Sequence, residues 1–267
     1  MRAPSRVSLV MCVFNGLEDT RACLESLAGT TESFRLVVMD NGSTDDTPGF
    51  FERFPYEYPL TFARSPANDG VIASLNRAWR LADSEFLCFL HNDTEMLEPA
   101  WLTRLLAALA EPGAGLAGLY GAKRLRADGR MVGRTIVHSL APGPTVRAPW
   151  EDEAFVVSVC MWLSLELLDV IGGFDEGYGF YHGHDRDLSL AVLERGRRCL
   201  VVHAPFRHHG GRTRTRDFAR DPDEARRDLA LRNSAMARFS QKYRRILPCD
   251  VRSRRERVRD WLGIGSA

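Results

Sequence analysis

The segment CFLHNDTEM, residues 88–96, places polar side chains directly after a hydrophobic run. His91, Asn92 and Asp93 follow Leu90 with no spacer between them. Imidazole and carboxylate groups are ligands that proteins use for divalent cations. A solvent-exposed turn could have the same composition, so this segment by itself predicts either a turn or a cation site.

Three further segments carry groups of the same kinds. Asp40 and Asn41 follow the apolar residues LVVM, and Asp185 lies in the segment HDRDLSL. His208 and His209 lie in the segment HHGG. Each segment also has an ordinary explanation, because acidic residues cap helices and a His-His-Gly-Gly loop is often polar surface. These positions are far apart in the chain, so their meaning depends on the elements that hold them.

Apolar runs and helical patterns alternate through the first half of the chain. Strands are predicted at residues 6–14, 34–40, 60–65, 85–90 and 116–121. Helical spacing of apolar residues predicts helices within residues 17–29, 43–54, 69–83 and 99–113. This alternation predicts an α/β fold with a mainly parallel sheet, helices on both faces and right-handed crossovers.

In such sheets, ligands bind outside the carboxyl ends of the strands. Asp40 ends the second predicted strand, and His91 to Asp93 follow the fourth. Both polar clusters are therefore expected in one crevice. This shared position favours a binding site over a solvated turn.

The pattern is less regular after about residue 121. Glycine, proline and charge at 121–153 predict hairpins or irregular loops. Later patterns predict a strand and short helix at 154–173, a helix at 185–196, a strand at 197–206, an amphipathic helix at 222–245 and a basic helix at about 250–262. We expect one compact domain at 1–215, with halves at about 1–120 and 121–215, and a basic helical C-terminal extension at 216–267.

The composition is that of an ordinary globular protein, 45% hydrophobic and 27% charged. The six cysteines form no CxxC pair and lie mostly in apolar runs, so we expect buried free thiols in a reducing compartment. No stretch reaches the roughly 18 consecutive apolar residues of a membrane-spanning helix. The N-terminal apolar run resembles a signal peptide, but it is short and is better explained as the first strand. We therefore expect a cytoplasmic protein.

The net charge of +1 hides a strong asymmetry along the chain. Residues 195–267 hold 19 Arg and one Lys against eight Asp or Glu, a net charge of +12, whereas residues 1–194 carry −11. A basic segment of this kind can attract anionic membranes, lipid-linked phosphates or nucleic acid, and a solvated helical face explains it equally well. We expect no nucleic-acid partner, because the segment lacks a recognised motif or an aromatic platform. No GxGxxG follows the first strand, which argues against a dinucleotide-dependent oxidoreductase.

Four segments, DNGSTDDT, HNDTEMLEPAWL, GGFDE and HDRDLSL…RG…HHGG, occur in the order and spacing of the family 2 inverting glycosyltransferases. The chain resembles these enzymes from about residue 6 to 211, in particular bacterial rhamnosyltransferases and related transferases of surface polysaccharides. The resemblance implies a GT-A fold, in which a mainly parallel nucleotide-sugar-binding sheet is flanked by helices. It also implies transfer of a sugar from a nucleotide-diphospho-sugar to a hydroxyl of a glycan or lipid-linked acceptor.

The resemblance assigns a divalent metal, Mn²⁺ or Mg²⁺, to the turn after the fourth strand. Asp93 corresponds to the metal-binding carboxylate of the family's DxD-like turn, and His208 to the distant histidine that completes the shell. His91 stands where the family usually has Asp or Asn, so His91 and His209 are alternate ligands. A cation at this position neutralises the charge that grows on a leaving diphosphate.

The resemblance also places the nucleotide-sugar against loops at the carboxyl ends of the first strands. Asp40 and Asn41 correspond to the turn that recognises the base and ribose. Phe14 lies near the family's usual proline-tyrosine pair and departs from it, and Asp45 and Asp46 are expected as helix caps. The full set of donor-side residues that match is Val13, Phe14, Asn15, Asp40, Asn41, Asn68, Gly70, Asn76, His91, Asn92 and Asp93.

Inversion requires a general base opposite the leaving group. Asp185 corresponds to the aspartate of the family's Glu-Asp-x-Asp block and inherits the base role, while Asp187 is expected only to cap the following helix. The loop GGFDEGYGFYHG would lie on the acceptor side, where its aromatic rings can stack on sugars or belong to the core. The acceptor-side residues that match are Phe174, Asp175, Tyr181 and His184.

Two further hypotheses follow, one from residues that depart from the family pattern and one from the basic C-terminal third. His91 stands where the family usually has Asp or Asn, and His184 replaces its glutamate, so the alternative to an enzyme is a non-catalytic GT-A-like module that binds a nucleotide-sugar or glycan. The basic C-terminal third suggests peripheral contact with anionic lipid at the inner face of the cell membrane. Donor sugar and base, acceptor, linkage and oligomeric state have no diagnostic spacing in the sequence.

Overall fold

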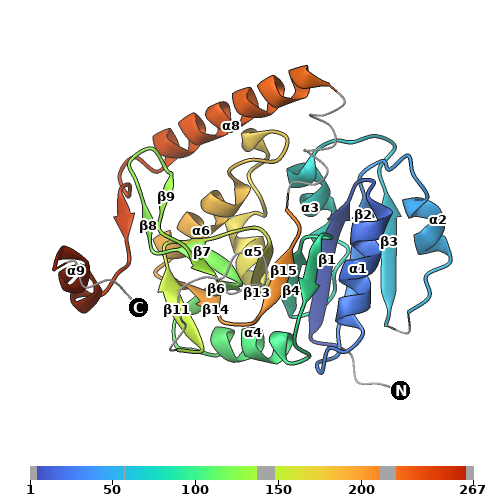
Figure 1. The fold of residues 1–267 in the computed structure, drawn as a ribbon, viewed down its shortest axis with the longest axis horizontal. Helices are drawn as coiled ribbons and strands as arrows, with labels where there is room; N and C mark the ends of the chain where they lie inside the picture. The colour runs from blue at the N-terminus through green and yellow to red at the C-terminus, as the bar shows by residue number, and fades with distance from the viewer. Residues whose placement is uncertain (1–4, 57, 137–147, 211–220, 263–267) are drawn as a thin grey trace.

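A computed structural model describes residues 5–56, 58–136, 148–210 and 221–262. At its centre is an eight-stranded sheet with the strand order β11-β14-β6-β13-β4-β1-β2-β3. Helices cover both faces of this sheet, as the alternating sequence pattern predicts (Figure 1). The chain therefore has the α/β architecture expected from its sequence.

The first half of the sheet is parallel. It consists of β1 (Val7–Val13), β2 (Arg35–Asp40), β3 (Leu60–Arg64) and β4 (Phe86–Leu90). The helices of this half are α1 (Leu17–Leu27), α2 (Thr47–Glu52), α3 (Val71–Trp79) and α4 (Trp101–Leu109), each within its predicted range. Because β1, β2 and β4 run in one direction, the residues that follow them lie along the same edge of the sheet.

The second half of the sheet is mixed, although most strands of the whole sheet run in one direction, as the sequence predicts. Its strands are β6 (Ala114–Gly118), β11 (Trp150–Glu153), β13 (Cys160–Ser164) and β14 (Arg198–Val202). β13 runs antiparallel to both β4 and β6, and β11 runs antiparallel to β14. The described part of the connection between β6 and β13 contains short antiparallel strands and no helix. These strands are β7 (Tyr120–Ala122), β8 (Arg124–Leu125), β9 (Met131–Val132), β10 (Thr135–Ile136) and β12 (Phe155–Val156).

The remaining elements surround the sheet. They are β5 (Thr94–Met96), α5 (Leu165–Ile171), the 3₁₀ turn η1 (Glu176–Tyr178), α6 (His184–Glu194), β15 (Phe206–His208), α8 (Pro222–Lys242), β16 (Cys249–Asp250) and α9 (Arg254–Trp261). α8 crosses above the edge where the parallel strands end, and α9 projects at the opposite side from β3 (Figure 1). None of the helices in the described part of the chain combines the length and apolar character needed to cross a bilayer.

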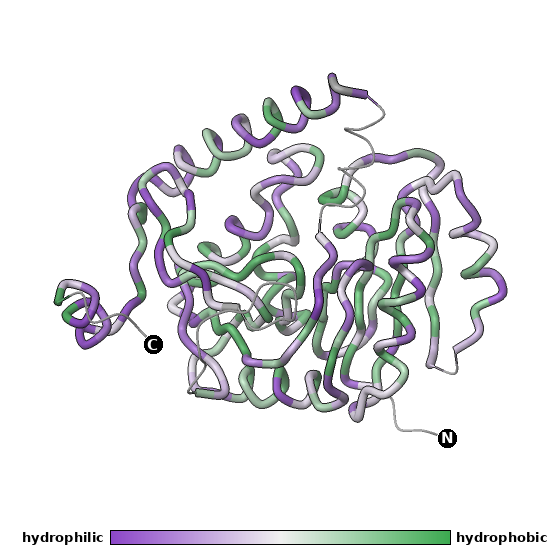
Figure 2. Tube along the Cα trace, in the orientation of Figure 1, coloured by the Kyte–Doolittle hydropathy of each residue, from purple (hydrophilic) through white to green (hydrophobic). Residues whose placement is uncertain are grey.

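Two hydrophobic cores lie on the two faces of the sheet. One contains Leu24 of α1 and Leu105 of α4, and the other contains Leu75 of α3 and Phe239 of α8. The tube in Figure 2 is hydrophobic along the central strands and largely hydrophilic along α9. Alternate strand residues face opposite cores, which is the expected arrangement for a sheet covered on both sides.

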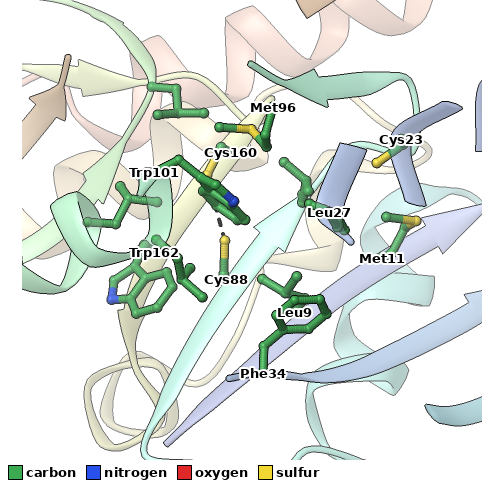
Figure 3. Packing of buried hydrophobic residues seen from close by; sticks show 14 of the residues in the cluster. Leu9, Met11, Cys23, Leu27, Phe34, Cys88, Met96, Trp101, Cys160 and Trp162 are labelled. Atoms are coloured by element: carbon green, nitrogen blue, oxygen red, sulfur yellow. Dashed lines mark hydrogen bonds between the residues drawn. The ribbon is translucent and has the colours of Figure 1, made fainter. Parts of the chain in front are cut away.

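The cysteines are free thiols, as their spacing predicts. Four of them are buried, and Cys12 and Cys249 are partly buried. Figure 3 shows Cys88 and Cys160 packed beside Trp101 and Trp162, with 3.7 Å between the two sulfur atoms. Burial raises the pKa of Cys88, so this thiol stays protonated and acts as a small apolar side chain.

Candidate active site

The pairing of β5 with β15 brings His208 to the turn that follows β4. These strands are antiparallel, with His208 opposite Thr94, so a residue 115 positions further along the chain lies next to Asp93. His208 Nε2 is 3.1 Å from Asp93 Oδ1, and His91 Nδ1 is 3.9 Å from the same oxygen. One ligand atom from each of His91, Asp93 and His208 lies within 4.8 Å of the other two.

This cluster fits a divalent cation. His208 Nε2 is buried and has no hydrogen-bond partner, although it lies next to Asp93. Burial lowers the pKa of His91 to about 4, so its imidazole is neutral near pH 7 and retains a lone pair for a metal. Burial alone would raise the pKa of Asp93, but His208 and His91 outweigh it and hold that pKa below its usual value. The donor set of two imidazoles and a carboxylate suits a first-row divalent metal.

Two neighbours of the cluster stabilise its backbone. His209 donates its backbone N–H to the Asp93 carbonyl at 3.0 Å, while its ring contacts Glu95 and lies outside the three-residue cluster. Asn92 turns its amide toward α1 and donates to Thr20 Oγ1 at 2.9 Å. The sequence pattern did not single out Glu95, which lies in β5. Its carboxylate links β5 to β15, because Arg207 of β15 also contacts it at 3.1 Å.

Asp40 and Asn41 lie at the carboxyl end of β2, beside Val13. Asp40 is fully buried, accepts from Ser43 N at 2.9 Å, and is 3.0 Å from Arg64 Nε. Asn41 donates its backbone N–H to the Val13 carbonyl at 2.8 Å. These contacts fix the turn after β2 against the end of β1, so the two predicted loops form one surface.

The end of β1 is held by Asn15, which adopts a positive φ of 53°. Its side-chain oxygen accepts from Thr44 N at 2.7 Å and from Asp45 N at 3.2 Å. Asp45 in turn accepts from Thr47 N in the first turn of α2 at 3.1 Å, which agrees with its expected capping role, whereas Asp46 makes no side-chain cap bond. Phe14, next to Asn15, is half-buried at this edge.

Asn68, between β3 and α3, lies with the predicted donor-side loops, whereas Asn76, within α3, does not. Asn68 bonds to the amide of Asn41 at 2.7 Å and belongs to the same loop surface. Asn76 is buried, and its amide bonds to Phe174 N, Phe174 O and Glu176 with distances of 2.8–2.9 Å. We therefore correct the donor-side assignment of Asn76: its side chain holds the loop before η1 and has no hydrogen-bonding capacity left for a nucleotide.

The backbone at Gly70 lies close to another loop of the protein. It has a φ of 91°, and an added Cβ would lie 2.6 Å from the carbonyl oxygen of Phe180. Val71 N donates to that same carbonyl at 2.8 Å. Glycine at this position thus lets the start of α3 contact the acceptor-side loop. The family resemblance instead attributes this glycine to contact with a nucleotide.

Asp185 lies in the first turn of α6 and is 7% exposed. Its carboxylate accepts from Arg186 N at 2.9 Å, a local contact that leaves its second oxygen available. Burial is the main cause of the low pKa of His91, and the nearby carboxylates of Asp93 and Asp185 act in the opposite direction and raise it. Asp185 is therefore within electrostatic reach of the His91, Asp93 and His208 cluster.

His184 is buried beside Asp185, with its ring in contact with Phe174 at a centroid distance of 5.6 Å. Neither of its ring nitrogens has a hydrogen-bond partner. Burial lowers the pKa of His184, which keeps the ring neutral. A neutral imidazole at this position could donate to or accept from an acceptor hydroxyl group.

The acceptor-side loop differs from expectation in three respects. Phe174 is 4% exposed and packs edge-on against Phe89, so it belongs to the core and is unable to stack on a sugar. Asp175 forms ion pairs with Arg238 and Lys242 of α8, both at 2.9 Å. Tyr181 is half-exposed, and its hydroxyl donates to Asp228 of α8. The sequence pattern gave no sign of these α8 partners, because they lie 47 to 67 positions away.

Asp187 does not cap α6, contrary to expectation. The N-cap position is Gly183, with no side-chain cap bond. Asp187 lies one turn into the helix, where its carboxylate accepts from Tyr178 Oη at 2.8 Å and is 2.6 Å from Lys242 Nζ. The tertiary partners of Asp187 therefore replace the local role that its position suggested.

The strand order and the polar cluster at the carboxyl edge of the sheet define a GT-A fold. The chain belongs to glycosyl transferase family 2, whose family model matches residues 8–171. The O-antigen biosynthesis protein RfbC of Myxococcus xanthus is 28% identical over 245 residues, which cover 84% of this chain and 19% of RfbC.

Two solved structures have the same fold. The mannosyltransferase PcManGT of Pyrobaculum calidifontis, in complex with GDP-Man and Mn²⁺, matches with a TM-score of 0.56 and 18% identity over 76% of this chain and 56% of that chain. GalNAc-T7, with UDP, GalNAc and Mn²⁺, matches with a TM-score of 0.62 and 13% identity over 76% of this chain and 42% of that chain. In each of these matches this chain spans less than two thirds of the other protein.

Proposed function

We propose that this chain is a metal-dependent inverting glycosyltransferase that moves a hexosyl or deoxyhexosyl group from a nucleotide-diphospho-sugar to a hydroxyl acceptor. The observation that carries the proposal is the convergence of His91, Asp93 and His208 at the carboxyl edge of a family 2 sheet. The name of RfbC supports a role in surface glycan or polysaccharide synthesis.

Asp93, His208 and His91 would hold Mn²⁺ or Mg²⁺. When bound, the cation supplies positive charge that stabilises the leaving nucleoside diphosphate. The turns around Asp40, Asn41 and Asn68, with Val13 to Asn15, would bind the nucleotide, since amide and carboxylate oxygens there can accept base N–H groups and ribose hydroxyls. Mn²⁺ in the complexes of PcManGT and GalNAc-T7 supports this arrangement.

Asp185 acts as the general base in this proposal. Its carboxylate takes the proton of the acceptor hydroxyl while the acceptor oxygen forms a bond to the anomeric carbon. The bond from that carbon to the phosphate oxygen breaks on the opposite face, and its electron pair leaves with the nucleoside diphosphate. Attack opposite the leaving group inverts the anomeric configuration. His184 would orient the acceptor hydroxyl from beside Asp185.

Two substitutions test the proposal. Asp93→Ala should abolish the dependence of sugar transfer on added Mn²⁺, and Asp185→Asn should lower turnover by about 10²- to 10⁴-fold, the usual contribution of a general base. The measurement is transfer or donor hydrolysis across a panel of nucleotide-sugars, with Mn²⁺, Mg²⁺ or EDTA. The panel also identifies the base and sugar.

Matched controls are Asp83→Ala and Asp169→Asn, which change carboxylates on exposed surface away from the site. Full activity in both site variants would contradict the assignment. Binding of nucleotide-sugar with no turnover in the wild type would favour the alternative, a non-catalytic binding module. In that case His91 and His184, which depart from the family pattern, would be the reason for the lost activity.

We further propose a glycan or lipid-linked acceptor and a cytoplasmic protein in peripheral contact with anionic lipid at the inner face of the membrane. The net charge of +12 in residues 195–267 supports this placement.

A further inference from the structure

Helix α8, which precedes α9 in the basic C-terminal segment, is part of the folded body. Ala235 and Phe239 of α8, and Tyr243 directly after it, are buried in the second core. An added Cβ on Gly129 would lie 2.5 Å from the Phe239 ring, so the turn between β8 and β9 also packs closely against α8. Figure 1 shows α8 passing over the edge of the molecule that carries the acceptor-side loop.

The end of α8 contacts the first turns of α6 through one buried carboxylate. Lys242 Nζ lies 2.6 Å from Asp187 Oδ1 and 2.9 Å from Asp175 Oδ2. Asp187 is 5% exposed, and Tyr243 Oη donates to its backbone carbonyl at 3.1 Å. Burial acts to lower the pKa of Lys242, but hydrogen bonds to Asp187 and Asp175 raise it overall, so the cation persists.

The beginning of α8 holds the same loop at a second point. Asp228 of α8 is buried, and it accepts from the Tyr181 hydroxyl and lies 2.9 Å from His182 Nε2. Asp228 and Lys242 are 14 positions apart, which is about 21 Å along a helix. One rigid helix therefore fixes both the segment before α6 and the first turns of α6.

This attachment matters because α6 has no local cap. Its N-cap is Gly183 in a left-handed conformation, which offers no side chain to the free N–H groups of the first turn. Asp185 is the second residue of α6, two positions before Asp187. The direction of its carboxylate is thus set by a turn that tertiary contacts hold in place.

We infer that Lys242 is a positioning residue for sugar transfer: through Asp187 and Asp175 it fixes the first turn of α6 and so the direction of Asp185 toward the acceptor hydroxyl. This inference rests on the proposed role of Asp185 as the base. It assigns the basic C-terminal segment a part in the site itself.

The test compares Lys242→Met with Lys242→Arg, and with Arg226→Met as a control that removes an exposed cation from the same helix. In Lys242→Met, turnover should fall roughly 10- to 100-fold, because small misplacements of catalytic groups have effects of that size. The dissociation constant of the nucleoside diphosphate should stay within about twofold, since its loops are in the other half of the sheet. Lys242→Arg should recover most of the turnover, and Arg226→Met should match the wild type.

A double variant separates positioning from stability. Lys242→Met leaves a buried carboxylate without a counter-ion, and adding Asp187→Asn removes that charge, so the melting temperature should recover. Turnover should stay low in the double variant because the link between α8 and α6 is still absent. If turnover recovers together with the melting temperature, Lys242 has only a structural role and the inference is wrong.

A measurement independent of activity distinguishes this inference from the proposed function. Backbone amides of residues 183–188 should exchange hydrogen faster in Lys242→Met than in the wild type. Unchanged exchange there would refute the attachment whether or not the wild type transfers sugar. A wild type that transfers no sugar, with faster exchange in the variant, would refute the base role while supporting the attachment.

Discussion

At the scale of single residues, two imidazoles stand in the candidate site where the family resemblance leads us to expect carboxylate or amide side chains. His184 is buried and His91 is partly buried, and desolvation lowers both pKa values, so each ring is neutral near pH 7. A neutral ring can bind a metal or exchange hydrogen bonds with a hydroxyl, whereas a carboxylate brings charge. With His91 and His208 beside Asp93, the donor set is softer than three oxygens, and we expect Mn²⁺ to support activity better than Mg²⁺.

Glu153 of β11 provides a test of electrostatics away from the site. It is 1% exposed, both its carboxylate oxygens are buried without a hydrogen-bond partner among the described residues, and burial raises its pKa to about 8. Its ordinary pKa is 4.5, so the unfolded chain releases the proton first as pH rises, and stability falls between about pH 4.5 and pH 8.

Glu153→Gln should remove this fall. Between pH 5 and pH 8 the wild type should lose on the order of 3 kcal/mol more unfolding free energy than the variant, measured by urea denaturation at each pH. Glu52→Gln, at an exposed position of α2, is the control and should follow the wild type. Identical pH profiles for Glu153→Gln and wild type would show that Glu153 does not titrate as described.

At the scale of elements, close contacts between loops decide how the two halves of the site meet. The turn before α3 touches the acceptor-side loop through Gly70 and the carbonyl of Phe180, and Asn76 of α3 holds that loop through the backbone of Phe174. A single helix thus links the donor half to the acceptor half. A change in α3 should therefore affect both.

Gly70→Ala should destabilise the protein and lower turnover. The φ of 91° disfavours a side chain, and the new Cβ would collide with backbone, which has little freedom to move. We expect a loss of about 1–3 kcal/mol of unfolding free energy, the usual range for such backbone strain. Gly29→Ala is the matched control, because an added Cβ there meets nothing within 4 Å. Equal melting temperatures for the two variants would contradict this account.

At the scale of the whole molecule, charge is divided between the ends of the chain. The acidic first 194 residues carry His91 and Asp93 of the candidate metal-ligand cluster, and the basic residues from 195 onward carry His208 and include α8 and α9. On α9, the arginines Arg254, Arg255, Arg257 and Arg259 accompany Trp261, which is 84% exposed. Arginine with exposed tryptophan suits the surface of an anionic bilayer.

The protein should therefore sediment with vesicles of phosphatidylglycerol and remain in solution with phosphatidylcholine. Reversing two charges, Arg254→Glu with Arg255→Glu, should weaken vesicle binding on the order of 10- to 100-fold, since each basic residue near such a surface contributes about 1 kcal/mol. Arg53→Glu, at the C-cap of α2, is the control in the acidic half and should have little effect. Binding that is equal for both lipids would rule out an electrostatic contact.

The sequence by itself determined the elements of the first half and the residues at their ends. Apolar runs of strand length and helical spacing are local properties, so β1 to β4 and their helices lie within the predicted ranges. The rule that parallel strands end at one edge then placed Asp40 and Asp93 at the same edge of the sheet without a structure. The pairing of Asp93 with His208 came from the family resemblance.

Only the tertiary structure decided which polar residues are free to act. Asn76, Asp175 and Asp187 carry the same groups as the site residues, but each is engaged by partners about 50 to 100 positions away. The mixed half of the sheet and the attachment of α8 likewise depend on long-range pairing that no local spacing encodes. The sequence specifies which chemical groups are present, whereas the availability of a side chain depends on its neighbours in space.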